Sequence, residues 1–246
     1  EDSMPLHVQA IPILSDNYAW LLRDEGTGAA GLVDPADADA CIAAVEAAGG
    51  RLDMILLTHH HDDHIAGVDA VRARYGCPVV GAAADARRLP RLDQAVREGD
   101  EVALGGSRLR VIDTPGHTVG HISYFSDGSA PVLLCGDTLF SLGCGRLLEG
   151  TAADMFASLH KLAALPVATL VCCGHEYSQS NARFALHVDG RNQALRHRAA
   201  TVARLRAAGL PTVPSMLGDE LAENPFLRAT SAEALGAIRS QKDQFR

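Results

Sequence analysis

Short apolar runs alternate with helix-like stretches from the start of the chain to about Cys173, a pattern typical of layered α/β proteins. The pattern predicts strands over 11–22, 31–33 and 54–57, a β-hairpin over 101–112, and helices over 38–48 and 63–75. Two glycine pairs support these elements: Gly49-Gly50 ends the first predicted helix, and Gly105-Gly106 forms the turn of the predicted hairpin. The first part of the chain is therefore predicted to be an α/β domain.

The pattern changes after Tyr177. Residues 192–208 and 231–242 form amphipathic helical stretches, and no convincing strand-like run lies between them. Because no long linker or internal repeat separates the two parts, the helical segment is expected to pack directly on the α/β domain. We therefore expect an α/β domain over 1–175 and a small helical domain over 176–246.

Composition places the chain among ordinary globular proteins, with 47% hydrophobic and 21% charged residues in 246 positions. No apolar run approaches the ~18 residues of a membrane span, and no secretory segment is visible, so a cytoplasmic protein without a membrane partner is expected. The six cysteines form no C-x-x-C pair and are expected to be buried and reduced.

The net charge is -8, from 22 basic and 30 acidic residues, so the chain lacks the broad basic surface that holds nucleic acid. A small anionic substrate would need a few local cations instead. We expect a monomer that binds a small molecule.

Four apolar runs each end just before a side chain that can bind a metal ion. These side chains are His59, His117, Asp137 and His175. The first run leads into the densest stretch, Thr58-His59-His60-His61-Asp62-Asp63-His64. Such a recurrence predicts a metal site along one edge of a sheet.

The spacing of these side chains predicts two metal ions rather than one. His59 and His61, at i and i+2 in an extended turn, point to one side, whereas Asp63 and His64 begin a helix and face a neighbouring position. With His117, Asp137 and His175, the set exceeds one tetrahedral zinc and suits two ions roughly 3.5 to 4 Å apart. Imidazoles and carboxylates without thiolate fit zinc, iron or manganese. His60 and His121 are not expected to ligate, although His121 suits a supporting role.

Four motifs resemble the metallo-β-lactamase superfamily: T-H-x-H-x-D-H, T-P-G-H-T-x-G-H, G-D-T-L-F and G-H-E-Y. Within it the chain is most similar to the hydroxyacylglutathione hydrolases, or type II glyoxalases, from Asp16-Asn17-Tyr18 to Lys242-Asp243-Gln244-Phe245. The resemblance implies an αββα sandwich followed by a small C-terminal helical domain, which agrees with the pattern described above.

The resemblance also implies roles for the metal-binding side chains. His59, His61 and His117 would hold one ion, Asp63, His64 and His175 the other, and Asp137 would bridge the two. Two divalent ions, zinc before iron or manganese, are expected. The implied reaction is hydrolysis of S-D-lactoylglutathione to D-lactate and glutathione, the second step of methylglyoxal detoxification. A hydroxide between the ions would attack the thioester, with Asp63 as the catalytic residue that orients it.

Glutathione contacts follow from the same resemblance. Arg239 and Lys242, three apart on the last helical stretch, match the contacts to a glutathione carboxylate, and Arg146 and Tyr177 match two further substrate contacts. Leu148 departs from the family, since many members have a tyrosine there that helps to bind the peptide part of glutathione.

Three other functions are compatible with parts of the pattern. A persulfide dioxygenase of the same superfamily would use a single iron, which leaves His64 and His175 unexplained. If the protein were a lactonase or β-lactamase, the pairing of Arg239 with Lys242 would have no explanation. A structural metal module is disfavoured because such sites are usually closed, four-ligand and rich in cysteine.

Overall fold

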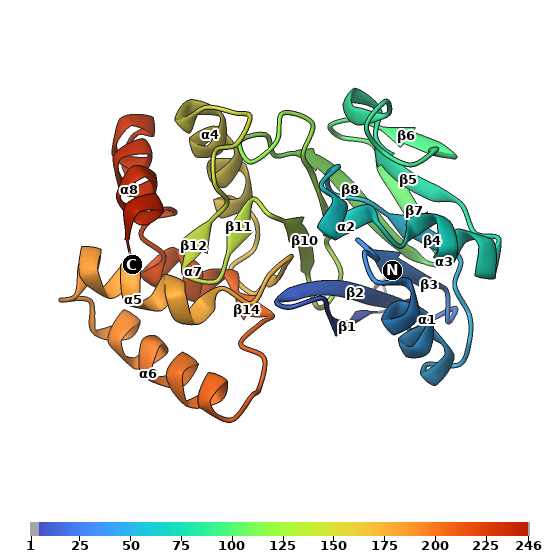
Figure 1. Ribbon diagram of the computed structural model, residues 1–246, viewed down its shortest axis with the longest axis horizontal. Helices are drawn as coiled ribbons and strands as arrows, with labels where there is room; N and C mark the ends of the chain where they lie inside the picture. The colour runs from blue at the N-terminus through green and yellow to red at the C-terminus, as the bar shows by residue number, and fades with distance from the viewer. Residues whose placement is uncertain (1–4, 246) are drawn as a thin grey trace.

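Two mixed β-sheets form the centre of the computed structural model, which describes residues 5–245 (Figure 1). The first sheet contains, in spatial order, β1 (Leu6–Ile13), β2 (Asn17–Asp24), β3 (Ala30–Val33), β4 (Met54–Leu56), β5 (Val79–Ala82) and β6 (Gln94–Val96). The second contains β14 (Ser215–Met216), β13 (Leu170–Cys173), β10 (Val132–Gly136), β9 (Ile122–Ser126), β8 (Ser107–Asp113) and β7 (Glu101–Leu104). A separate hairpin joins β11 (Leu139–Phe140) to β12 (Gly143–Cys144).

Strand direction brings several strand ends to one edge. In the first sheet, β3, β4, β5 and β6 run parallel, so the ends of β3 and β4 lie beside each other, with Val33 opposite Leu56. In the second sheet, β10 and β13 are parallel, with Gly136 opposite Cys173. Side chains that follow these strands are therefore neighbours in space.

Successive side chains along the strands of the first sheet point to opposite faces, so the sheet contributes to two hydrophobic cores. Leu22 and Leu56 belong to the core between the sheets, where they join Leu109 and Leu134 of the second sheet. Their sequence neighbours point the other way: Leu21 and Ile55 pack under α1 (Ala38–Ala47) and α3 (Val68–Tyr75). On the second sheet, Met155 and Leu159 of α4 (Ala152–Ala163) pack into the same core as its strands. The result is the αββα sandwich that the resemblance implied.

Helices with strong end signals frame this sandwich. The first turn of α4 carries a capping box between Thr151 and Asp154, and Ser231 caps α8. The remaining helices are α2 (Asp62–Ile65), the 3₁₀ turn η1 (Ala83–Asp85), α5 (Ser178–Asp189), α6 (Gln193–Ala207), α7 (Leu217–Glu223) and α8 (Ala232–Gln244). Figure 1 shows α5, α6 and α8 gathered at the end of the molecule opposite α1 and α3.

The predicted hairpin over 101–112 and the helix over 38–48 are confirmed to within about one residue. The single helix over 63–75 was wrong, because α2 and α3 are separate. Gly67 lies between them in close contact with the chain after β3, where a Cβ atom would be 2.4 Å from the Pro35 carbonyl oxygen. This contact explains why the residue between the two helices is a glycine, and helical spacing alone could not reveal that α2 and α3 are separate.

The expectation of a C-terminal segment without strands was also wrong. Ser215–Met216 forms β14, which pairs antiparallel with β13 at the edge of the second sheet. Two residues are too few for an alternating pattern, so the strand leaves no mark in the sequence. The helical segment is thus joined to the sandwich by backbone hydrogen bonds as well as by packing.

All six cysteines are free and buried, as expected. Across residues 5–245, none of the helices combines the length and apolar character needed to cross a membrane.

Candidate metal centre and substrate pocket

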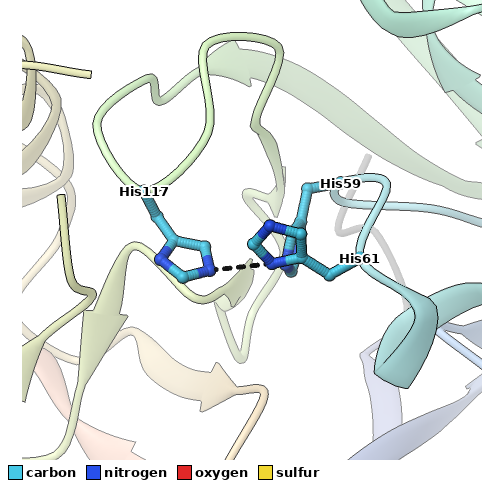
Figure 2. A group of neighbouring side chains, drawn as sticks. All are labelled: His59, His61 and His117. Carbon is cyan, nitrogen blue, oxygen red and sulfur yellow. Dashed lines mark hydrogen bonds between the residues drawn. The ribbon is translucent and has the colours of Figure 1, made fainter. Parts of the chain in front are cut away.

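Three histidines from two loops form the first possible metal cluster. His59 and His61 follow β4, and His117 follows β8; each offers one nitrogen, and these nitrogens all lie within 4.8 Å of one another. Figure 2 shows the three rings converging, with His117 Nε2 and His61 Nδ1 3.1 Å apart. The geometry unites the three residues that the resemblance assigned to one ion.

A second cluster lies next to the first. Asp63 and His64 belong to α2, and His175 follows β13, with their ligand atoms also within 4.8 Å of one another. Asp63 Oδ2 is 3.3 Å from His175 Nε2 and 3.6 Å from His64 Nε2. These are the three residues that the resemblance assigned to the other ion.

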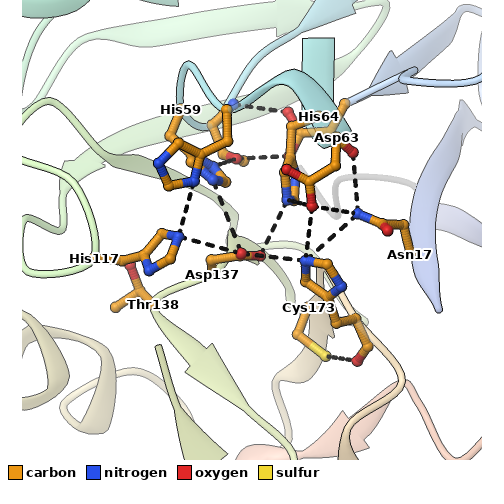
Figure 3. A network of polar contacts seen from close by, with 12 residues as sticks. Asn17, His59, Asp63, His64, His117, Asp137, Thr138 and Cys173 are labelled. Carbon is orange, nitrogen blue, oxygen red and sulfur yellow. Dashed lines mark hydrogen bonds and ion pairs between the residues drawn. The ribbon is translucent and has the colours of Figure 1, made fainter. Parts of the chain in front are cut away.

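Asp137 lies between the two clusters (Figure 3). Its Oδ2 atom is 3.4 Å from His117 Nε2 and 3.2 Å from His175 Nε2, while its Oδ1 atom is 3.3 Å from His64 Nε2. One carboxylate thus faces both sets of ligands, as a bridging residue must.

The buried atoms of this centre fit a pair of cations. His59 Nε2, His64 Nε2 and Asp137 Oδ1 are buried without a hydrogen-bond partner. Burying unpaired polar atoms is costly, and bound cations would satisfy them. With imidazole and carboxylate donors in two adjoining groups, the His and Asp clusters of this fold suggest a dinuclear metal site.

The charges of the centre favour the same interpretation. Burial lowers the pKa of His59, which keeps its ring neutral and able to ligate. Burial also acts to lower the pKa of His175, but the Asp137 and Asp63 carboxylates outweigh it and raise that pKa to about 10. The two carboxylates therefore favour positive charge in the centre, and bound divalent ions would supply that charge.

Several residues that orient the clusters were not identified from the sequence. Asp34 Oδ2 is 2.9 Å from His64 Nδ1, and Asp16 Oδ1 is 2.9 Å from His175 Nδ1. Asn17 Nδ2 donates to Asp63 Oδ2 at 2.9 Å. Asp34 directly follows β3, so it carries the same strand-end signal that identified the ligands. Such partners fix the ring orientation of metal-binding histidines.

His121 has the supporting role that the sequence suggested. The backbone N–H of Asp137 donates to His121 Nε2 at 3.1 Å, and His121 Nδ1 lies 2.9 Å from the Thr114 hydroxyl. Burial lowers the pKa of His121 to about 3, so the ring is neutral. Both nitrogens are engaged, and within residues 5–245 neither His121 nor His60 joins a metal cluster.

A pocket of about 550 Å³ connects the metal centre with the helical segment. Its wall includes all four predicted substrate residues, Arg146, Tyr177, Arg239 and Lys242, together with Leu148. The Tyr177 ring stacks on His175 with centroids 4.5 Å apart, and Lys242 Nζ donates to the Ser180 hydroxyl at 2.8 Å. Phe140, Ser180 and Asn181 also line the pocket and were not predicted.

Comparison with known families divides the chain at one position. Residues 14–175 match the metallo-beta-lactamase superfamily, and residues 176–245 match the C-terminal region of hydroxyacylglutathione hydrolases. A hydroxyacylglutathione hydrolase from Acidiphilium cryptum is 61% identical over 97% of this chain and 96% of its own length. One from Rhodospirillum rubrum is 56% identical over 93% of this chain and 89% of its own length.

Among solved structures, ETHE1 from Myxococcus xanthus superposes with a TM-score of 0.70 and 27% identity, over 96% of this chain and 90% of the other. The sandwich, the two His/Asp clusters and the adjoining helical segment therefore have a common explanation. The chain belongs to the metallo-β-lactamase superfamily and, within it, to the hydroxyacylglutathione hydrolases.

Proposed function

We propose that this enzyme hydrolyses S-D-lactoylglutathione, and related 2-hydroxyacyl thioesters of glutathione, to the free acid and glutathione. The observation that carries the proposal is the single pocket in which the two His/Asp clusters adjoin Arg146 and Lys242. A thioester bound there would have its acyl carbon at the clusters and its peptide carboxylates near the cations. The resemblance places this reaction in the removal of methylglyoxal.

The residues divide between two metal positions. His59, His61 and His117 would hold one divalent ion, Asp63, His64 and His175 the other, and Asp137 both. Zinc is our first choice, with iron or manganese compatible with the same donors. When bound, two such ions lower the pKa of water toward about 7 and polarise a carbonyl oxygen.

Asp63 is the proposed catalytic carboxylate. Asn17 donates to Asp63 Oδ2, and the Asp63 side chain is 42% exposed in the pocket, so the carboxylate can also accept a hydrogen bond from water. Asp63 would thus orient the attacking water toward the thioester carbon. The leaving thiolate derives from a thiol with a pKa near about 8.5, so its departure needs no strong acid.

The helical segment supplies the recognition of glutathione. Glutathione carries two carboxylates, and charge-assisted hydrogen bonds to Lys and Arg bind carboxylates strongly. Lys242 and Arg146 line the same pocket as the metal ligands, and the Tyr177 ring stacks on His175. We place the functional division at residues 175 and 176, with metal ligands before it and most substrate contacts after it.

The monomeric state expected from the sequence stays a prediction. The cytoplasmic location stays a prediction.

The test is hydrolysis of S-D-lactoylglutathione by freshly purified protein, with metal content counted on the same sample. We expect turnover by protein carrying two ions per chain. A fully metallated protein that leaves the thioester intact would overturn the proposal. Faster turnover of a lactone or β-lactam, or oxygen consumption with glutathione persulfide, would favour the rival functions.

A further inference from the structure

A polar network in which Asp85 is buried and Glu149 and Arg88 are partly exposed lies beside the first metal cluster and takes no part in the chemistry described above. Its centre is Glu149, in the loop between β12 and α4. Glu149 Oε2 accepts the backbone N–H of Val119 at 2.9 Å, and Glu149 Oε1 lies 3.4 Å from His60 Nε2. One carboxylate therefore contacts the loop that carries His117 and the loop that carries His59 and His61.

Arg88 and Asp85 complete the network from η1 and the residues after it. Arg88 donates to both carboxylates, with Nη1 2.6 Å from Glu149 Oε1 and Nη2 2.6 Å from Asp85 Oδ1. The other oxygen of Asp85 is 3.3 Å from His60 Nδ1. Asp85 is 4% exposed and packs against Gly120, where a Cβ atom would be 2.3 Å from Asp85 Cγ. His60 thus lies between two carboxylates, although its Nδ1 atom and Asp85 Oδ2 form no hydrogen bond in this geometry.

The segment around Glu149 also orients a ligand directly. His117 Nδ1 donates to the Arg146 carbonyl oxygen at 2.9 Å, and the Gly150 N–H donates to the Gly116 carbonyl oxygen at 3.0 Å. Fixing this segment through Glu149 therefore fixes the hydrogen bond that sets the His117 ring. All three ligands of the first cluster depend on loops that meet at Glu149.

The second cluster is supported by a different part of the protein. Its ligands are held by Asp16, Asn17 and Asp34, which lie before β2, at its start and after β3. None of these three contacts involves Glu149, His60 or Arg88. Asp34 also accepts from the Thr58 hydroxyl at 2.6 Å, and that hydroxyl lies 2.9 Å from His59 Nδ1, so Asp34 reaches the first cluster as well. Among the ligand-bearing loops, the contacts of Glu149 reach only those of the first cluster.

We propose that Glu149 is a positioning residue that sets the metal affinity of the His59, His61 and His117 position, and not that of the Asp63, His64 and His175 position. Glu149 does this by joining His60, Arg88 and the Val119 N–H, which keeps the two ligand-bearing loops at a fixed separation. The inference rests on the metal assignment under the proposed function.

The experiment is a zinc titration of metal-free protein against a competing chelator, for the natural chain and for Glu149→Gln. Glutamine keeps the size and one acceptor but loses the charge that pairs with Arg88. Outer partners of metal ligands commonly change metal affinity by about 10- to 100-fold. We expect one of the two binding steps to weaken by about tenfold and the other to stay within about twofold.

Two backgrounds identify the affected position. His175→Ala impairs the second cluster, and there Glu149→Gln should weaken zinc binding by about tenfold. His117→Ala impairs the first cluster, and in that background Glu149→Gln should have no effect.

Glu46→Gln is the matched control. Glu46 also pairs with an arginine and a second side chain, Arg74 and Tyr75, and it lies in α1, outside the loops that carry the metal ligands. His60→Asn provides a second disruption of the network if Glu149→Gln folds poorly.

The possible failures are distinguishable. If the natural chain binds fewer than two zinc ions, the proposed dinuclear centre fails and this inference falls with it. If the natural chain binds two ions and Glu149→Gln weakens both steps equally or neither, only the positioning role is overturned. A general structural role would lower thermal stability without separating the two steps.

Discussion

The guanidinium of Arg239 donates to the backbone carbonyl oxygen of Cys144 at 2.6 Å and so ties α8 to the hairpin strand β12. Its remaining nitrogens contact the Asp243 carboxylate, with Nη2 at 2.9 Å, and the residue is only 6% exposed. Lys242 is more exposed and donates to Ser180. The two cations that the sequence treated as equivalent therefore stand in different environments.

This difference predicts separate effects for Arg239→Ala and Lys242→Ala. Removing Arg239 breaks buried, charge-assisted hydrogen bonds, which should cost about 1.5 to 3 kcal/mol of unfolding free energy and lower Tm by several degrees. It should also raise KM, because the loop that carries Arg146 loses its support. Removing Lys242 should mainly raise KM, by about tenfold, with little change in Tm. Thermal denaturation and steady-state kinetics on both variants check this, and equal Tm values would contradict it.

Asp137→Ala should remove both metal ions and nearly all turnover. Asp137 faces His64, His117 and His175 at 3.2 to 3.4 Å, so its loss deprives both clusters of one ligand. We expect metal affinity to fall by at least about 100-fold and kcat to follow it. Metal counting and kinetics on the same sample measure both effects. A variant that keeps two ions and the normal rate would exclude the bridging role.

The sequence could predict a layered α/β domain and the metal-binding side chains because both depend on local signals, whereas the sandwich and the division into two clusters came from the resemblance. A strand end followed by His59, His117, Asp137 or His175 is visible without any knowledge of tertiary contacts. The partners of these residues are not visible in this way. Asp16 meets His175 and Glu149 meets His60 only after strands far apart in sequence have paired.

Three further features could not be predicted because they depend on tertiary contacts: the separation of α2 from α3, the strand β14 and the burial of Arg239. Gly67, between α2 and α3, lies against the chain after β3, and β14 pairs with the edge of β13. Both features depend on contacts between segments far apart in sequence. The environment of Arg239 depends on Cys144, which is 95 residues away. Residue type identified Arg239 as a cation at the substrate site, but its burial could come only from the structure.

Leu148 offers a direct test of glutathione recognition. It lines the pocket, is 58% exposed and provides no hydrogen-bond donor at the position where the resemblance implies a tyrosine. Leu148→Tyr should lower KM for S-D-lactoylglutathione by about three- to tenfold, since one net hydrogen bond contributes about 0.5 to 1.5 kcal/mol. Leu148→Phe is the matched control that adds the ring without the hydroxyl. Equal KM values for the two variants would mean that the hydroxyl finds no partner on the substrate.

Glu223 in α7 should make stability depend on pH at a position away from the metal centre. Burial, helped by the charges of Asp219 and Glu220, raises the pKa of the Glu223 carboxyl to about 7 despite the nearby Arg198 guanidinium. A carboxyl whose pKa is raised in the folded state contributes stability at low pH and loses it as pH rises through the folded value. The natural chain should therefore lose stability between about pH 4.5 and 7 through this group.

Glu223→Gln should remove that loss, because the amide stays neutral at every pH. We expect Tm of the variant to match that of the natural chain near pH 5 and to exceed it by about 3 to 6 °C at pH 8, equivalent to about 1 to 2 kcal/mol. Thermal denaturation at the two pH values measures the difference, with the exposed Glu25→Gln as the control expected to change neither value. A variant that is destabilised at pH 8 would mean that the attraction between Glu223 and Arg198, 3.9 Å apart, outweighs the burial of the charge.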